Sequence, residues 1–252
     1  MAIWDDPQTR TERSGFNTAT VGVPRATRDA GLRSYMLSVY NYMASGVLLT
    51  GIIALGFANS SLINLIINPS TGQATPLFWI ALFAPLGVVF ALSFGINRIS
   101  AATAQALFWI YAALVGVQFS SLFLVYTGVS IAQTFFAVAA GFAGLSLWGY
   151  TTKRDLSGMG SFLIMGVFGL FIALMINIFL RSPALNLAVS AIGVLLFAGL
   201  TAYDTQKIKS IYFVVAGNGE AMAKSAVIGA LNLYLDFINM FLFLLRFMGQ
   251  RR

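Results

Sequence analysis

Seven long apolar stretches, separated by polar connections, constrain this chain more than any other feature of its sequence. A helix needs about 20 predominantly apolar residues to cross the hydrocarbon layer of a bilayer. The stretches occupy residues 35–57, 78–97, 103–126, 131–150, 159–180, 184–204 and 226–246. Only 9% of the residues are charged, whereas about 25% is typical of a soluble domain. The sequence therefore predicts an all-α, polytopic membrane protein with seven transmembrane helices.

The polar segments divide the chain into a short head and one membrane domain. Residues 1–33 lack the apolar run of a cleavable signal peptide, and they predict a disordered cytoplasmic head. Residues 34–252 then form the seven-helix membrane domain. Its longest connections, 58–77 and 205–225, are rich in polar residues, and we expect both to be loops.

Basic residues set the expected orientation of the helices. They are frequent in residues 1–33 and in every second connection, whereas the opposite connections hold only Arg181. Because cytoplasmic connections carry the excess of Lys and Arg, the N-terminus should lie in the cytoplasm, with the helices in the cell inner membrane. Seven spans then place Arg246, Arg251 and Arg252 near the outer side, against this rule. A seventh segment that re-enters and returns is the alternative.

The formal net charge of +7 does not indicate a nucleic-acid partner, because the basic residues lie mostly between the apolar stretches. The sequence contains no cysteine and no histidine, which excludes cysteine nucleophiles and histidine-based catalytic triads.

An intramembrane aspartyl protease would need two acids on adjacent helices, and Tyr203-Asp204 resembles half of the presenilin signature. Leu233-Tyr-Leu precedes Asp236, however, where a Gly-x-Gly is expected. We expect no enzymatic activity and no tightly bound cofactor.

Two of the eight acidic residues lie within or at the edge of an apolar stretch. Asp204 closes the sixth stretch, and Asp236 lies near the middle of the seventh. Ionisable groups at such positions are costly, so they normally face the bundle interior and mark a functional site. Asn232, Asp236 and Asn239 share one helical face at i, i+4 and i+7, and Arg246 continues this polar stripe. We expect the stripe to face the other helices.

Each acid also has a simpler interpretation. Asp204 could be a helix-end residue that is hydrated at the membrane surface or paired with Lys207 or Lys209. Asp236 could be a structural acid that accepts hydrogen bonds from Asn or Tyr side chains. Arg98, at the end of the second stretch, is a candidate counter-charge, and an ordinary cytoplasmic arginine is an equally good interpretation.

If the two carboxyl groups converge, burial and like charge favour an arrangement that shares one proton. The pair would then respond to pH without a histidine. Loss of the proton would separate the groups, admit water and offer oxygen ligands to a hard cation such as Ca²⁺. Tight Ca²⁺ binding usually takes about six to eight oxygens. Asp204 and Asp236 would therefore form only a weak metal site, which Asn232, Asn239, backbone carbonyls and water would complete.

The residues around these two acids resemble a known family. Tyr203-Asp204 is followed by Gln206, Lys207 and Ile208, and the last stretch contains Leu233-Tyr-Leu-Asp-Phe-Ile-Asn239 and Leu244-Leu-Arg-Phe247. These motifs are similar to those of bacterial members of the Bax inhibitor-1 (transmembrane Bax-inhibitor-motif) family. The resemblance covers all seven stretches and is most specific in the seventh. The interval between the acids is longer here than in the family, which indicates an insertion at residues 214–223.

The resemblance implies a seventh helix enclosed by the other six and a pH-sensitive Ca²⁺ leak gated by the aspartate pair, here Asp204 and Asp236. It also implies an arginine that alternately pairs with this dyad, and Arg98 matches that arginine by position only. Bacterial members are further linked to a membrane-bound AAA protease, which implies a possible protease partner.

Two functions therefore stay open. The first is a pH-sensitive cation leak, with Ca²⁺ as the permeant ion and with membrane lipid and protons as the other partners. The second is a membrane-embedded regulator that binds a membrane protease or another membrane protein and in which the dyad is structural. Residues 1–33 and 205–225 would be its contact surfaces. A proton-coupled transporter would need an interrupted helix pair, which the sequence does not indicate.

Overall fold

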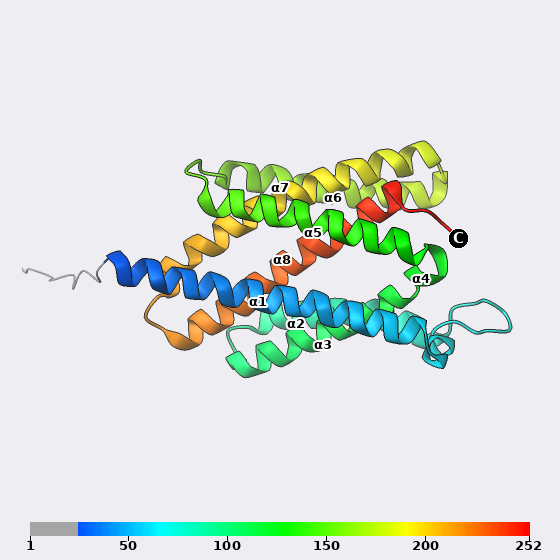
Figure 1. Cartoon of the computed structure of the whole chain (residues 1–252), viewed down its shortest axis with the longest axis horizontal. Coiled ribbons are helices and arrows are strands. Elements are labelled where there is room, and N and C mark those ends of the chain that lie inside the picture. The colour runs from blue at the N-terminus through cyan, green and yellow to red at the C-terminus, as the bar shows by residue number, and fades with distance from the viewer. Residues whose placement is uncertain (1–24) are drawn as a thin grey trace, which may run out of the picture.

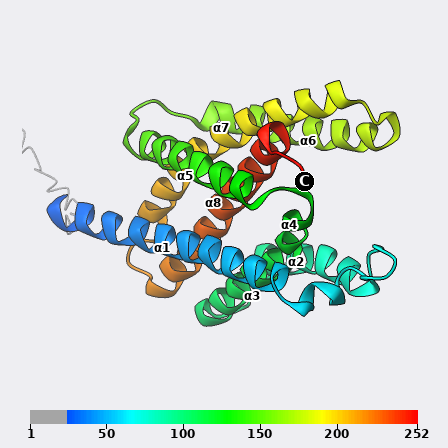
Figure 2. The same ribbon diagram turned by 45° about the vertical axis from the view of Figure 1, so that its right-hand side comes forward.

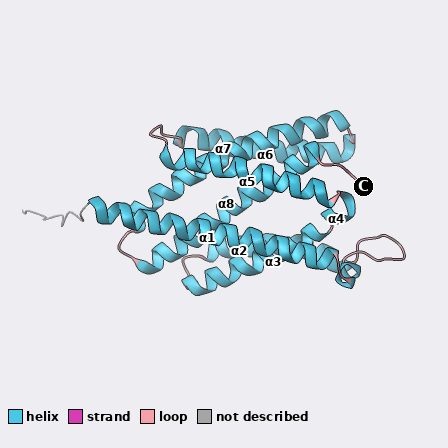
Figure 3. Ribbon diagram, in the orientation of Figure 1, coloured by secondary structure: helices cyan, strands magenta, loops and turns pink. Residues whose placement is uncertain are grey.

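The computed structural model describes residues 25–252, so residues 1–24 of the predicted disordered head lie outside the described residues. Long helices make up most of this part, and no strand runs through residues 25–252 (Figures 1 and 3). The elements are α1 (Arg25–Ala58), the 3-10 helix η1 (Ser61–Leu65), α2 (Pro76–Gly95), α3 (Ala101–Ser120), α4 (Leu122–Val125), α5 (Gly128–Thr151), α6 (Ser157–Leu180), α7 (Pro183–Val215) and α8 (Gly219–Met248). Seven spans are long and apolar enough to cross a membrane, and α3 and α4 share one of them. The predicted all-α fold with seven membrane helices is confirmed.

Two predicted boundaries differ from the structure. Helix α1 begins at Arg25, so residues 25–33, which the sequence placed in the disordered head, are helical. The loop predicted at 205–225 is wrong, because α7 continues to Val215 and α8 begins at Gly219. The last turns of α7 are amphipathic, with Ile208 and Tyr212 buried in the core, so their mean hydropathy is low although the helix continues.

The chain therefore reverses between α7 and α8 in three residues only. Gly217 has a φ of 99°, a left-handed conformation that glycine adopts without strain. The Asn218 side chain then accepts a hydrogen bond from the backbone N–H of Ala221, which satisfies a free donor at the start of α8. This short turn makes α7 and α8 a tightly packed antiparallel pair.

Helix α8 is the central helix of the bundle. It crosses between a group formed by α1, α2 and α3 and a group formed by α5, α6 and α7 (Figures 1 and 2). Its main neighbours are α1, α3, α5 and α7, and it buries more of its span than any other helix. At 30 residues it is about 45 Å long, enough to cross a bilayer in one pass. The re-entrant alternative is therefore wrong.

The two ends of the bundle differ in charge. The end at which α1 begins also holds the α2–α3, α5–α6 and α7–α8 connections, with Arg98, Lys153, Arg154 and Lys224 (Figure 1). We call it the basic end. The opposite end holds the α6–α7 connection with Arg181 and the end of α8 with Arg246, Arg251 and Arg252, so it carries fewer basic residues (Figure 1).

Candidate functional site

The register of α7 against α8 places Asp204 and Asp236 on facing sides of the two helices. A Cβ on Gly193 of α7 would touch the Phe243 ring of α8, and a Cβ on Gly229 of α8 would touch Ile208 of α7. Asp204 shares the α7 face of Gly193 and Ile208, and Asp236 shares the α8 face of Phe243. In this antiparallel register, the two acids are about one helical turn apart along the helix axes.

The direction of the side chains closes this gap. Every Cα–Cβ bond in a helix tilts toward the N-terminus of that helix. In an antiparallel pair, the Asp204 side chain therefore leans toward the level of Asp236, and the Asp236 side chain leans toward the level of Asp204. The negative charge of Asp204 accordingly acts on Asp236. The register and this charge effect place Asp204 and Asp236 near each other across the contact of α7 with α8, and their gating role stays a prediction.

Asp236 is the more deeply buried of the two acids. Its side chain is only 4% exposed, and its Oδ2 atom has no hydrogen-bond partner among the described residues. The predicted Asn and Tyr donors bind elsewhere: the Asn239 amide donates to the Leu235 carbonyl oxygen, and the Tyr234 hydroxyl contacts the Thr50 hydroxyl. Within the described residues, neither Asn239 nor Tyr234 donates to this atom, and the structural role of Asp236 stays an alternative.

Asp204 lies within α7 rather than at its end, about three turns before Val215. Its side chain is half-buried. The positive charge of Lys207 acts on it, but the Lys207 ammonium forms no ion pair with it and lies 5.9 Å from the centre of the Tyr203 ring. The Lys209 ammonium instead donates to the Tyr150 carbonyl oxygen at 2.7 Å. Neither lysine neutralises Asp204 by direct pairing.

The rest of the predicted stripe follows the α7 side of α8. Asn232 is half-buried at the level of Asp204, and Asn239 is half-buried one turn beyond Asp236. Arg246 is exposed, with its guanidinium 5.7 Å from the centre of the Phe243 ring. The stripe thus runs from the buried acid pair to the water-accessible end of α8.

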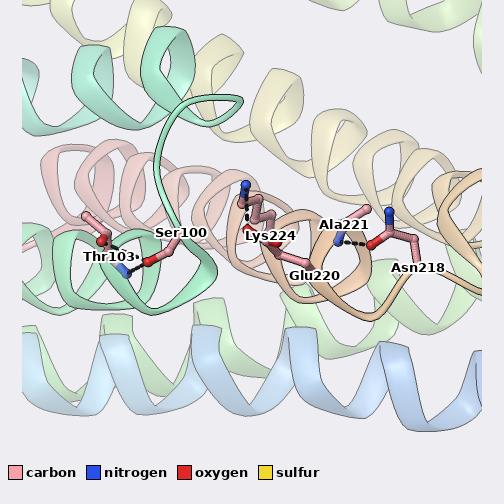
Figure 4. A network of polar contacts seen from close by, with 6 residues as sticks. All are labelled: Ser100, Thr103, Asn218, Glu220, Ala221 and Lys224. Carbon is pink, nitrogen blue, oxygen red and sulfur yellow. Dashed lines mark hydrogen bonds and ion pairs between the residues drawn. The ribbon is translucent and has the colours of Figure 1, made fainter.

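Helix caps and an ion pair lie at the basic end of the bundle. Ser100 caps α3 through the backbone N–H of Thr103, and Lys224 pairs with Glu220 at 2.9 Å on the first turns of α8 (Figure 4). Arg98 lies in the adjoining α2–α3 turn, and its exposed side chain forms no ion pair within the part of the chain that the structure describes. The structure does not bring Arg98 to the dyad, so its counter-charge role stays a prediction.

Asp155, just before α6, offers a useful contrast with the buried pair. Its carboxylate accepts a hydrogen bond from the backbone N–H of Ser157 at 2.9 Å. Hydrogen bonding from Ser157, first from its side chain and then from its backbone, holds the pKa of Asp155 below its ordinary value. Asp155 is an exposed, solvated acid outside the bundle core.

A buried chain of hydroxyl groups, which sequence reasoning missed, lies beside Asp204. The Tyr40 hydroxyl of α1 contacts the Ser146 hydroxyl of α5 at 2.6 Å, and Ser146 contacts the Thr205 hydroxyl of α7 at 2.9 Å. The Thr205 hydroxyl donates to the Thr201 carbonyl oxygen at 2.7 Å. Because each hydroxyl has one proton, the donors run in one direction, from Tyr40 through Ser146 to Thr205.

This hydroxyl chain borders a cavity of about 470 Å³ between α1 and α5, which Arg33, Tyr40, Ser146 and Tyr150 help to line. The cavity lies in the half of the bundle near the basic end. The Thr201 and Thr205 pair at i and i+4, at the end of the sixth apolar stretch, was the available signal, but the partner helices could not be read from the sequence.

The Ser146→Ala substitution tests whether this chain stabilises the contact of α1, α5 and α7. We expect it to lower the free energy of unfolding by about 1–2 kcal/mol, because the buried Thr205 hydroxyl loses its donor and the Tyr40 hydroxyl loses its acceptor. Thermal unfolding in detergent would measure the change. The matched control is Ser210→Ala on α7, where an exposed hydroxyl contacts only carbonyls of its own helix. Equal stability of Ser146→Ala and Ser210→Ala would contradict this role.

Comparison with known proteins identifies the family. Residues 32–252 match a family model described as "Inhibitor of apoptosis-promoting Bax1". The chain belongs to the Bax inhibitor-1 family. A protein of Rickettsia prowazekii is 49% identical over 235 residues, which cover 93% of this chain and 97% of that protein. The inner membrane protein YbhL of Escherichia coli is 46% identical over 225 residues, which cover 88% of this chain and 94% of YbhL.

Membership of the Bax inhibitor-1 family and the seven apolar helices together make the chain a multi-pass membrane protein. The family resemblance drawn from the motifs around Asp204 and Asp236 is therefore confirmed. Within residues 25–252, no three His, Cys, Asp or Glu side chains gather into a metal-binding cluster. The acid pair offers two carboxyl groups, which suit a transient cation better than a tightly held one.

Proposed function

We propose that this Bax inhibitor-1 family member is a pH-sensitive cation leak, in which Asp204 and Asp236 control the passage of Ca²⁺. The observation that carries the proposal is the unpaired Oδ2 atom of Asp236, which is buried beside a second carboxyl group. A buried carboxylate without a partner is costly, so either a proton or a cation must stabilise it. These two ways of stabilising Asp236, by a proton or by a cation, correspond to the closed and the open state of a gate.

The closed state holds the carboxyl groups of Asp204 and Asp236 together through one shared proton. Loss of that proton leaves two negative charges facing each other on α7 and α8, and their repulsion favours separation and hydration. The hydrated carboxylates then present oxygen ligands to Ca²⁺, with Asn232 on the same face of α8. Binding is weak, which allows the ion to leave as well as to enter.

The surroundings of the pair support this mechanism. The cavity between α1 and α5 reaches Ser146, which is joined through Thr205 to the α7 segment that carries Asp204. The basic residues at this end favour its placement in the cytoplasm, together with the N-terminus. The name of the relative YbhL supports the inner membrane as the location.

Ca²⁺ flux into proteoliposomes tests the proposal directly. We expect wild-type flux to rise about tenfold or more from about pH 5 to about pH 8, because loss of the shared proton opens the pair. The Asp204→Asn variant should lack this rise, since an amide cannot lose a proton to create the second charge. Empty liposomes and the solvated-acid variant Asp155→Asn serve as controls. Folded wild-type protein without flux would contradict the channel function.

The alternative function, a regulator that binds a membrane protease, rests on the family resemblance. Its predicted contact loop at 205–225 is helical, and residues 1–24 of its other contact surface lie outside the described residues. Deletion of residues 1–24 separates the two functions. If the shortened protein no longer restores the phenotype of cells that lack the protein but still passes Ca²⁺ in proteoliposomes, the regulator is favoured. If it keeps both activities, the leak is favoured.

A further inference from the structure

An apolar groove opens on the side of the bundle between α1 and α5. It lies in the half away from the basic end, near the end of α8. It encloses about 270 Å³, and its floor is the central helix α8 at Phe237 and Phe241. Thr50 is the polar residue of its lining, and the Thr50 hydroxyl is already engaged by the Tyr234 hydroxyl and the Ala112 carbonyl oxygen. The groove therefore offers its occupant no free hydrogen-bonding group, and a hydrocarbon chain fits it.

The groove has room for an acyl chain and runs in the direction that a lipid chain takes in a bilayer. A Cβ on Gly51, in the α1 wall, would meet no atom within 4 Å. The α5 wall runs from Gly128 to Phe136, which is about 12 Å along the helix axis. The groove thus runs along the helices from near the opposite end into the membrane interior, in the direction of a lipid chain.

The backbones of two arginines lie next to the α4–α5 connection, between the groove residues Phe123 and Gly128. Residues 249–252 turn back along the α4–α5 connection, where Thr127 N–H donates to the Gln250 carbonyl oxygen and Arg252 N–H donates to that of Val125. Arg251 forms an isolated bridge with Tyr126. These contacts fix both arginine backbones beside Gly128, the first groove residue of α5, next to α4 (Figure 2). The side chains of Arg251 and Arg252 are exposed.

We propose that the groove binds an acyl chain of an anionic phospholipid and that Arg251 and Arg252 hold the phosphate. The positive charge of these arginines is complementary to a phosphate, and guanidinium groups pair with phosphate through parallel hydrogen bonds. The apolar floor takes the chain of the same molecule. This assignment gives a role to two arginines that lie at the end of the bundle where basic residues are otherwise few.

Lipid binding to the delipidated protein, followed by native mass spectrometry, tests the site. Phosphatidylglycerol and phosphatidylcholine with identical acyl chains are compared at low ionic strength. We expect phosphatidylglycerol to bind more tightly, and the double variant Arg251→Gln, Arg252→Gln to lower its affinity about 10- to 30-fold while leaving phosphatidylcholine unchanged. Gly51→Phe, which fills the groove, should weaken both lipids.

Two matched variants serve as controls. Arg181→Gln removes another exposed arginine at the same end, and Gly56→Phe adds a ring on α1 outside the groove, where a Cβ also meets no atom within 4 Å. Both should bind the two lipids as the wild type does.

Equal wild-type affinity for the two lipids, or no loss in the arginine variant, would overturn the proposal. A dimer that Gly51→Phe abolishes would identify a second copy as the occupant instead. The arginine variant decides even where Gly51→Phe fails to fold, and the readout does not depend on ion flux.

Discussion

Asp236→Asn is expected to hold Ca²⁺ flux at its acidic level at every pH from about 5 to about 8. The amide N–H of the new side chain can donate permanently to the Asp204 carboxylate, as the shared proton does in the closed state. The second negative charge can no longer form on α8, so the repulsion that separates α7 from α8 is lost. At about pH 8 the variant should pass Ca²⁺ about tenfold or more slowly than wild type. Flux into proteoliposomes of matched protein content measures this difference.

The controls separate gating from a general effect of the lost charge. Asp155→Asn removes an exposed acid outside the bundle core and should keep the wild-type pH profile. The double variant Asp204→Asn, Asp236→Asn should behave like either single variant, because the two residues act as one unit. A wild-type pH profile in Asp236→Asn would show that the acid pair is not the gate.

Gly149→Val is expected to lower the free energy of unfolding by about 1–3 kcal/mol, the usual cost of overpacking a close contact. Gly149 of α5 packs against the backbone of Ala202 of α7, and a Cβ there would clash with the Ala202 carbonyl oxygen. Backbone atoms cannot turn aside as a flexible side chain can, so the two helices must move apart. Thermal unfolding in detergent measures the loss.

The matched control for this substitution is Gly144→Val on the same helix. A Cβ at Gly144 meets no atom within 4 Å, and the residue is exposed on the outside of the bundle. Both variants change helix propensity in the same way. The difference between their free energies of unfolding therefore reports the contact of α5 with α7 alone. Equal stability of the two variants would contradict the close approach.

The seven spans, and the placement of Asp204 and Asp236 on neighbouring helices, could be predicted because they depend on local pattern. Apolar stretches of this length have few alternatives to a membrane helix. The polar face of Asn232, Asp236 and Asn239 follows from helical periodicity alone. That Asp204 belongs with it follows from two consecutive antiparallel helices, whose facing residues lie near each other.

The extension of α7 and the hydroxyl chain could not be predicted, because they depend on tertiary packing. The last turns of α7 contain Lys207 and Lys209, and their low mean hydropathy hides the buried positions of Ile208 and Tyr212. The chain through Tyr40 joins residues of three helices that are far apart in the sequence. Which helices are neighbours decides such contacts, and hydropathy does not specify neighbours.

The fixed end of α8 has a consequence for how the two acids can separate. Backbone hydrogen bonds tie residues 249–252 to the α4–α5 connection, whereas the other end of α8 follows a three-residue turn after α7. Sliding of α8 along its axis would break the ties at the first end. The three-residue turn also holds the start of α8 to the end of α7. Both ends of α8 are therefore fixed, and separation of Asp204 from Asp236 has to displace the middle of α8, where Asp236 lies.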